Sequence, residues 1–223
     1  MNGSPLASAP LFHIGPVPIA LAVVTTWGIM LALVVVSLLA TRRLELHPGR
    51  LQAAVELLVT TLERQISETT SADPAPFVPL LGTLFIYLAF ANASAVVPGL
   101  HPPTAQIETA GALALIVFCA VHYYGIRRRG LAGYLRSFAR PTILMVPFNI
   151  LSNITRTFSL MIRLFGNVMS GEFMIGIVLA LAGLLVPIPL MALEVLVGLV
   201  QAYIFSVLAA VFVGAALGSI EGG

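Results

Sequence analysis

The chain has 223 residues, of which 59% are hydrophobic and 9% are charged, and its formal net charge is +2. Ordinary soluble domains carry about 25% charged residues, so this composition excludes a water-soluble fold and indicates an integral membrane protein. The small net charge gives no reason to expect nucleic acid as a partner.

The first predicted membrane span covers residues 17–40, which carry no charged side chain. Its length is close to the roughly 20 residues that a helix needs to cross the hydrocarbon of a bilayer. The preceding residues lack the basic region of a cleavable signal peptide. We therefore expect this span to stay in the mature protein.

An amphipathic helix is predicted over residues 50–68. Apolar residues recur there at helical spacing, and the opposite face carries Glu56, Glu63 and Arg64. A helix that lies on the inner membrane surface, or packs against a partner, would satisfy both faces.

Two more uncharged segments, 77–98 and 110–126, are predicted to form the second and third spans. The third contains Cys119, the only cysteine, so no disulfide can form within one chain. We interpret this cysteine as a small apolar residue of the span.

The last part of the chain, residues 142–220, is apolar over almost its whole length. Its main interruption contains Gly183, Pro187 and Pro189, which predict a turn. This part should therefore fold back on itself as a hairpin.

The two arms of this hairpin, 142–182 and 186–220, would each be helices about 50 Å long or more. A helix of that length cannot stand upright in hydrocarbon about 30 Å thick. We expect both arms to be strongly tilted, although a break near Pro147 could shorten the first.

All eleven basic residues are arginines, and nine of them lie in the connections 41–76 and 127–141. Because Lys and Arg near span ends mark the cytoplasmic side, the N-terminus is expected outside and the C-terminus inside. The sequence thus predicts one all-α, polytopic membrane domain over residues 1–223. It has about five membrane-crossing helices and one amphipathic interfacial helix.

A polar stripe follows the first arm of the hairpin. An arginine at mid-membrane depth costs at least about 2.5 to 3.5 kcal/mol, so Arg163 needs an explanation. An internal ion pair or a snorkelling side chain could provide one. Other polar residues, however, share its helical face at steps of three, four or seven, which is typical of an ion pathway; they are Asn153, Arg156, Asn167 and Ser170.

The second arm carries Glu194 and Gln201, seven residues apart and so on one helical face. In an antiparallel hairpin centred on Gly183, the pairs Arg163 with Gln201 and Glu172 with Glu194 should face each other. Two neighbouring carboxylates in a membrane favour sharing a proton. We expect Glu172, which lies half a turn from the Arg163 stripe, to share a water path with Glu194.

The stretches SLMIRLFGNVMSGE (159–172) and LVQAYIF (199–205) resemble subunit a of F-type ATP synthases, the stator channel of the membrane sector. The order of spans and the topology agree with that family over nearly the whole chain. The resemblance implies two aqueous half-channels, which load and unload a carboxylate on each c subunit of a rotating ring. It also implies that the hairpin faces this ring, with Arg163 keeping the half-channels apart.

The resemblance further implies that Asn167, Glu172, Glu194 and Gln201 line the ion path. A second set of residues is expected near it; the set comprises Asn153, Arg156, Ser170, His101 and Glu108. The implied partners are the c-ring, b-type peripheral stalk subunits, the remaining subunits of the complex and the lipid of a bacterial inner membrane.

Several features bear on the chemistry. The four histidines lack metal-ligand spacing, and neither a phosphate-binding glycine loop nor any lysine is present, so no metal, cofactor or ATP is expected to bind. The chain should not be an enzyme by itself. Many bacterial members have Asp and Asn at the places of Gln106 and Glu108, and some have His at that of Glu194. These departures leave open whether protons or sodium ions pass.

A self-contained secondary transporter is the alternative from another functional class. Such proteins often contain inverted repeats or paired broken helices, and neither is evident in the sequence. A transporter would purify alone or as a homo-oligomer, whereas a stator subunit would copurify with a ring of small hairpin subunits. A purely structural role would instead predict that Arg163 tolerates substitution.

Overall fold

The computed structural model describes residues 10–14, 17–41, 49–69, 75–96, 102–138, 144–183 and 186–217. Within these ranges the chain forms helices and one small two-stranded hairpin. Their bounds are β1 Pro10–Ile14, β2 Val17–Ala20, α1 Leu21–Thr41, α2 Arg50–Thr69, α3 Val78–Ala93, η1 Ser94–Val96, η2 Pro103–Ala105, α4 Ile107–Phe138, α5 Met145–Ala182 and α6 Pro187–Leu217. Five of the helices, α1 and α3 to α6, are long and apolar enough to cross a membrane. The predicted all-α, polytopic fold with five spans is confirmed.

The first span differs from its predicted bounds at the N-terminal end. Residues 17–20 form strand β2, which pairs antiparallel with β1, so the helix begins at Leu21. Pro18 has no amide hydrogen for a helical hydrogen bond, and the β-branched Val17 and Ile19 favour an extended chain. The apolar run extends from one element into the next, which is why hydropathy by itself did not separate them.

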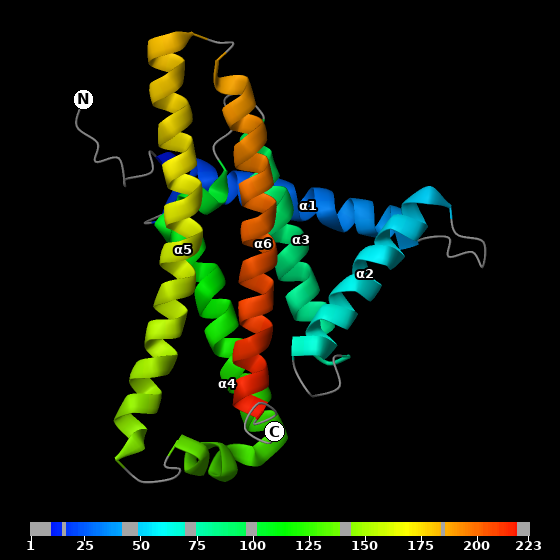
Figure 1. Ribbon diagram of the computed structural model, residues 1–223, viewed down its shortest axis with the longest axis vertical. Coiled ribbons are helices and arrows are strands. Elements are labelled where there is room, and N and C mark those ends of the chain that lie inside the picture. Colours follow the sequence, from blue (N-terminus) through cyan, green and yellow to red (C-terminus); the bar gives the residue numbers. More distant parts are fainter. Residues whose placement is uncertain are drawn as a thin grey trace.

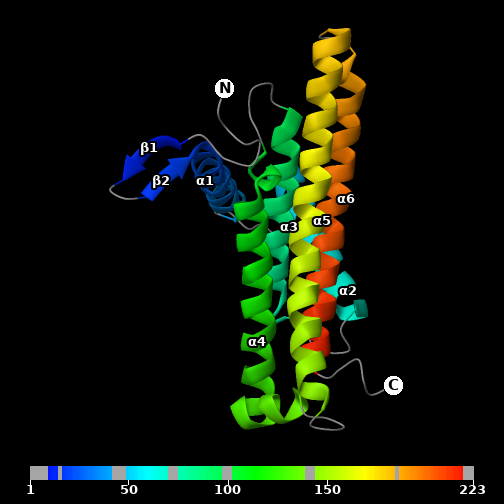
Figure 2. The same ribbon diagram turned by 90° about the vertical axis from the view of Figure 1, so that its left-hand side faces the viewer.

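Four long helices, α3 to α6, run side by side along the long axis of the molecule, and α1 lies across them (Figures 1 and 2). Helix α6 packs against α3, α4 and α5, and α4 also packs against α5. Their shared core contains Leu88, Leu164 and Phe205, all with no exposed surface. On α5 the buried residues Leu160, Leu164 and Val168 recur every four positions, which leaves most of this helix outside the core.

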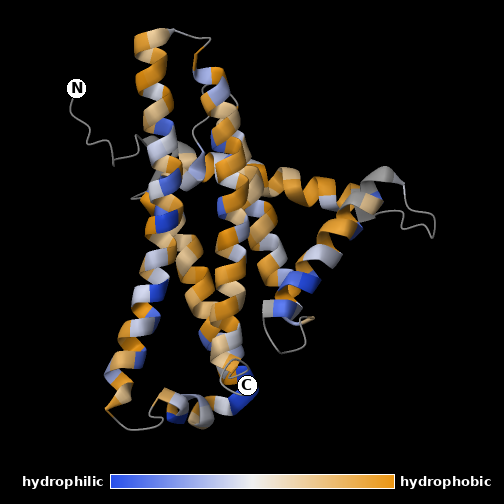
Figure 3. Cartoon of the chain, viewed as in Figure 1, coloured by the Kyte–Doolittle hydropathy of each residue, from blue (hydrophilic) through white to orange (hydrophobic). Residues whose placement is uncertain are grey.

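The helices consist largely of hydrophobic residues, which are orange in Figure 3. Many of their large apolar side chains are exposed on the outside of the bundle. Leu31 of α1 is 69% exposed, and Leu181 of α5 is 83% exposed. A soluble monomer rarely exposes so continuous an apolar surface. The surface suits a bilayer, whose hydrocarbon takes the place of water as the solvent.

The helices α5 and α6 form the expected hairpin. With 38 and 31 residues, they are about 57 and 46 Å long, well beyond the thickness of bilayer hydrocarbon. Gly183 follows α5 with φ of 78°, a conformation that glycine adopts easily, and α6 begins at Pro187. Pro147 does not break α5, because it lies in the first turn, where the helix tolerates proline.

Helix α4 is longer than the predicted span 110–126 and bends sharply near its end. Gly130 adopts φ of 70° and ψ of 163°, and the residues after it turn across the lower end of the bundle (Figure 1). Tyr134 then packs on Gly125, where a Cβ atom would lie only 2.5 Å from the tyrosine ring. The absent side chain at Gly125 therefore allows the last part of α4 to fold back.

Helix α2 is amphipathic, as predicted, and begins at Arg50. Leu62 and Ile66 are buried, and α2 packs against α3 and α6. On the exposed side, the Arg64 guanidinium donates a hydrogen bond of 2.9 Å to the Glu68 carboxylate, and this contact raises the pKa of Arg64. The apolar face of α2 thus packs on the bundle through the second half of this helix.

Candidate functional site

Arg163 lies on the outer side of α5, flanking the stripe that Leu160 and Leu164 bury in the core. Its side chain is exposed. Within the described part of the chain, no side-chain hydrogen bond or ion pair involves this arginine. The guanidinium is therefore available to a group outside the chain.

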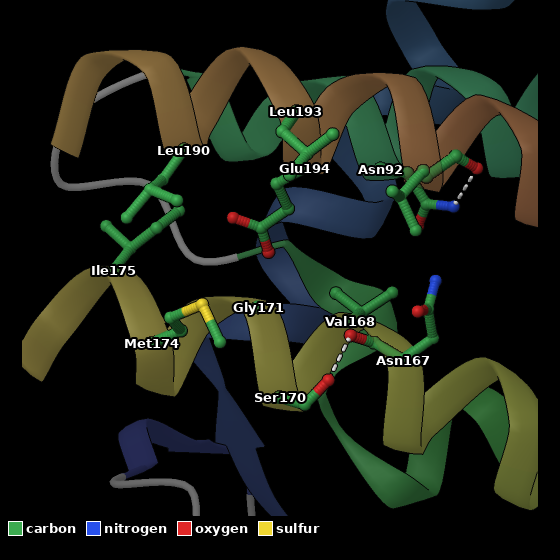
Figure 4. A pocket seen from close by; sticks show the side chains of 12 residues that line it. Asn92, Asn167, Val168, Ser170, Gly171, Met174, Ile175, Leu190, Leu193 and Glu194 are labelled. Carbon is green, nitrogen blue, oxygen red and sulfur yellow. Dashed lines mark hydrogen bonds between the residues drawn. The ribbon is translucent and has the colours of Figure 1, made fainter.

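A cavity of about 140 Å³ lies between α5 and α6, and we call it the hairpin cavity (Figure 4). Its polar lining consists of Asn92, Asn167, Ser170 and Glu194, and its apolar walls include Met174, Ile175, Leu190 and Leu193. Figure 4 shows Asn167 pointing from α5, and Glu194 from α6, into the space between the helices. A polar space of this size can hold several water molecules.

The Glu194 carboxylate lies directly against Gly171. A Cβ atom at Gly171 would be 2.6 Å from Glu194 Oε1, so a side chain there would displace the carboxylate. Glu194 Oε1 is buried and accepts no hydrogen bond from the described residues. Because a buried carboxylate oxygen is costly to leave without a donor, it favours water in the cavity.

The contact of Gly171 with Glu194 also reports the register of the hairpin. Gly171 lies twelve residues before Gly183, and Glu194 lies eleven after it. This register agrees with the one expected from the polar residues of the two arms. The position of the turn and the spacing of the polar residues were therefore sufficient to place α5 against α6.

A buried hydrogen-bond network forms one wall of the hairpin cavity, and the sequence analysis did not predict it. Asn92 of α3, which is 2% exposed, donates from Nδ2 to the carbonyl oxygen of Gly198 at 2.8 Å. Thr104 of η2 donates from Oγ1 to Asn92 Oδ1 at 2.7 Å. The available signal was the polar Asn92 in an otherwise apolar span, but only the fold brings its partners to it.

Glu172 lies on the other flank of α5. It lines a separate cavity of about 520 Å³ together with Ala105 of η2 and Gly176. The structure thus places Glu172 and Glu194 in different cavities, and the expectation that they share one water path stays a prediction.

Gln201 is buried in α6, with 6% of its surface exposed. Its Nε2 atom donates no hydrogen bond within the described residues, and the same holds for the nearby Ser206 Oγ. No hydrogen bond joins Gln201 to the exposed Arg163. The two residues occupy the expected register without a direct polar contact.

A second polar region lies toward the first turn of α5. We call it the α5 groove, a space of about 450 Å³ whose polar residues are Ser152, Thr155, Arg156 and Ser159. The Arg156 guanidinium lies 5.6 Å from the centre of the Phe212 ring. Asn153 lines a larger neighbouring cavity. The α5 groove and the hairpin cavity share no lining residue, and Arg163 lies between them along the helix.

One of the other expected residues lies at the start of α4. Glu108 is exposed in the first turn, where a carboxylate stabilises the positive end of the helix dipole. His101 lies outside the described residues. Among the described residues, no three His, Cys, Asp or Glu side chains lie close enough to hold a metal ion.

Comparison with known proteins gives a consistent result. The family described as ATP synthase A chain matches residues 23–214. The chain is 63% identical to ATP synthase subunit a 2 from Bradyrhizobium sp. over 223 residues, all of both chains. It is 49% identical to ATP synthase subunit a 1 from Hahella chejuensis over 94% of its own length and 90% of that protein's. It is also 50% identical to ATP synthase subunit a from Albidiferax ferrireducens, over 87% and 85% of the two lengths.

Proposed function

Because this chain belongs to the ATP synthase subunit a family, we propose that it is the ion-translocating stator of the membrane sector. In this role it provides two aqueous half-channels to a rotating ring of c subunits. Ion flow through them, of protons or of sodium ions, drives the ring and hence ATP synthesis. The chain has no catalytic step of its own and works only as part of the complex.

The position of Arg163 between two separate polar spaces carries the proposal. The hairpin cavity serves as one half-channel, and the α5 groove serves as the other. An ion that enters one space cannot reach the other without passing the guanidinium. The positive charge of this guanidinium blocks a direct leak of cations. Its exposed charge also attracts the emptied carboxylate of a c subunit.

The hairpin cavity has the groups that a proton path needs. Glu194 presents a buried carboxylate oxygen that can take a proton from water in the cavity. The Asn167 side chain can hydrogen-bond the same water, and Asn92 is held in place by Gly198. A proton taken up by Glu194 can then pass onward to the ring.

Orientation and partners follow from the same arrangement. The arginine-rich end of the bundle faces the cytoplasm of a bacterial cell, and the N-terminus lies outside. The exposed face of α5 around Arg163 meets the c-ring, while b-type stalk subunits pack elsewhere on the chain. Each ion that crosses the membrane releases about 2.3 kcal/mol per charge for each 100 mV of membrane potential. A leak of ions past Arg163 would release this free energy without turning the ring.

Substitution of Arg163 tests the function. In the complete complex reconstituted into vesicles, Arg163→Ala should abolish ATP synthesis driven by an ion gradient, because the half-channels are no longer separated. Arg128→Ala removes an equal charge from an exposed site on α4 and should leave synthesis near the wild-type rate. Recovery of the c-ring with each variant confirms assembly. Normal synthesis by an assembled Arg163→Ala complex would contradict the proposal.

A further inference from the structure

The end of the bundle where α4 bends contains a cavity of about 820 Å³, which adjoins the α5 groove. The two spaces share Arg156 in their lining. Three arginines line it, one each from the two parts of α4 and one from α5; they are Arg129, Arg136 and Arg156. Asn149 and Ser137 add hydrogen-bonding groups, and none of the described lining residues is acidic. We call this space the arginine cavity. We propose that it binds the phosphate of an anionic phospholipid headgroup.

The arginine cavity is held in shape by specific packing. The bend at Gly130 turns the last part of α4 beneath the bundle (Figures 1 and 2). Tyr134 anchors this part on Gly125 and is 5% exposed. Asn149 of α5 donates from Nδ2 to the Phe138 carbonyl oxygen at 2.9 Å, which fixes the end of α4 to α5. The arginines on either side of the bend are therefore brought toward Arg156 by the fold.

The positive charges of the arginine cavity favour the binding of an anion. Within the described residues, no carboxylate of the chain balances Arg129, Arg136 or Arg156. Like charges that face one space repel each other, and a shared anion offsets that repulsion. Guanidinium groups bind phosphate oxygens through paired N–H donors, so a phosphate suits the cavity better than a simple halide.

The surroundings favour a lipid phosphate over free phosphate. Apolar side chains next to the cavity are exposed, among them Leu131 and Leu135 of α4 and Leu144 and Phe148 at the start of α5. Phe212 and Met145 line the cavity itself. Acyl chains would cover these groups while the headgroup meets the arginines. Basic pockets between membrane helices on the cytoplasmic side bind phospholipid headgroups in this way.

Lipid binding to the purified full chain in detergent tests this proposal. Native mass spectrometry would compare the affinity for phosphatidylglycerol with that for phosphatidylcholine. The wild-type chain should prefer the anionic lipid. The double variant R129Q/R136Q should reduce this preference about tenfold or more, because each arginine adds to the electrostatic attraction for an anionic headgroup. The matched control R127Q/R128Q removes the same charge from exposed positions outside the cavity and should reduce it much less.

Each other result would overturn the proposal. Equal affinity of the wild-type chain for both lipids would show that no anionic headgroup is selected. Equal losses in the two double variants would show a general effect of surface charge. If millimolar inorganic phosphate displaced the bound phosphatidylglycerol, a free phosphate would be the ligand.

A second measurement covers the case in which R129Q/R136Q does not fold. A phosphatidylglycerol analogue with a photoreactive headgroup, added to the wild-type chain, should label the residues at the end of α4 and the start of α5. Labelling spread evenly over the chain would contradict a defined site. Both readouts measure lipid binding and not ATP synthesis, so they stand or fall independently of the proposed function.

Discussion

At the scale of single residues, two glycines decide where the polar groups of the hairpin cavity lie. Gly171 leaves room for the Glu194 carboxylate, and Gly198 leaves room for Asn92, whose Cβ would lie 2.7 Å from a Cβ at that position. In both cases a polar side chain from another helix occupies the space that the Cβ atom of any larger residue at the glycine position would need. The small residues thus let helices approach closely around a polar space.

Substitution of Gly171 tests this arrangement. Gly171→Ala should displace the Glu194 carboxylate and lower ATP-driven ion pumping by the reconstituted complex several-fold. The overpacking should also cost about 1 to 3 kcal/mol of stability, which thermal unfolding would report. Gly176→Ala is the control on the same helix, because a Cβ atom there meets nothing within 4 Å. Equal pumping by the two variants would argue against the role of Gly171.

At the scale of elements, the bend in α4 shows how one backbone conformation shapes a cavity. Gly130 has φ of 70° and ψ of 163°, a region of backbone conformation that is almost restricted to glycine. Without this residue, α4 would continue straight and carry Arg136 away from Arg156. The sequence RRRG indicated a basic connection, and glycine by itself does not say in which direction a helix turns.

A substitution in α4 tests the bend. Gly130→Ala should destabilise the chain by about 1 to 3 kcal/mol, because a side chain strains this backbone conformation. Gly133→Ala is the matched control three residues further on, where a Cβ atom would make an ordinary contact of 3.5 Å with Arg129. That variant should be as stable as the wild type or slightly more stable, since alanine favours helix. Thermal unfolding in the same detergent would measure both, and equal melting temperatures would contradict the account.

At the scale of the whole molecule, the lengths and the directions of the helices together determine how the chain can lie in a bilayer. Helix α1, with 21 residues, is about 31 Å long and could cross the hydrocarbon upright, whereas α5 is nearly twice as long. Since α1 lies across the long axis of the other helices, α1 and the bundle cannot both stand upright in one bilayer (Figure 1). We therefore expect α5 and α6 to lie obliquely in the bilayer, as their lengths predicted.

Spin labels on α5 would measure this tilt. Ile150 and Leu181 are both exposed, and thirty-one residues of helix separate them by about 46 Å. Labels at the two sites should both be accessible to oxygen from the lipid, because a strongly tilted helix keeps both inside hydrocarbon about 30 Å thick. A label at Leu31 on α1 provides a reference inside the bilayer. Strong exposure of one α5 label to a water-soluble relaxant would contradict the tilt.

The sequence by itself determined the membrane class, the five spans, the amphipathic helix and the register of the final hairpin. These features depend on local composition, on helical period and on the length needed to cross hydrocarbon, all of which can be read along one segment. Even the pairing of α5 with α6 could be predicted from the sequence, because a turn at Gly183 determines which residues of the two helices face each other.

Only the tertiary structure decided how distant segments meet. It placed Asn92 on Gly198, put Glu172 and Glu194 in different cavities, and folded the end of α4 under the bundle. These results depend on close contacts between elements far apart in the chain. Helical period gives the face on which a side chain lies, but not which neighbour leaves space for it. That space is a property of the packed helices, and it is where the polar groups of this protein are brought together.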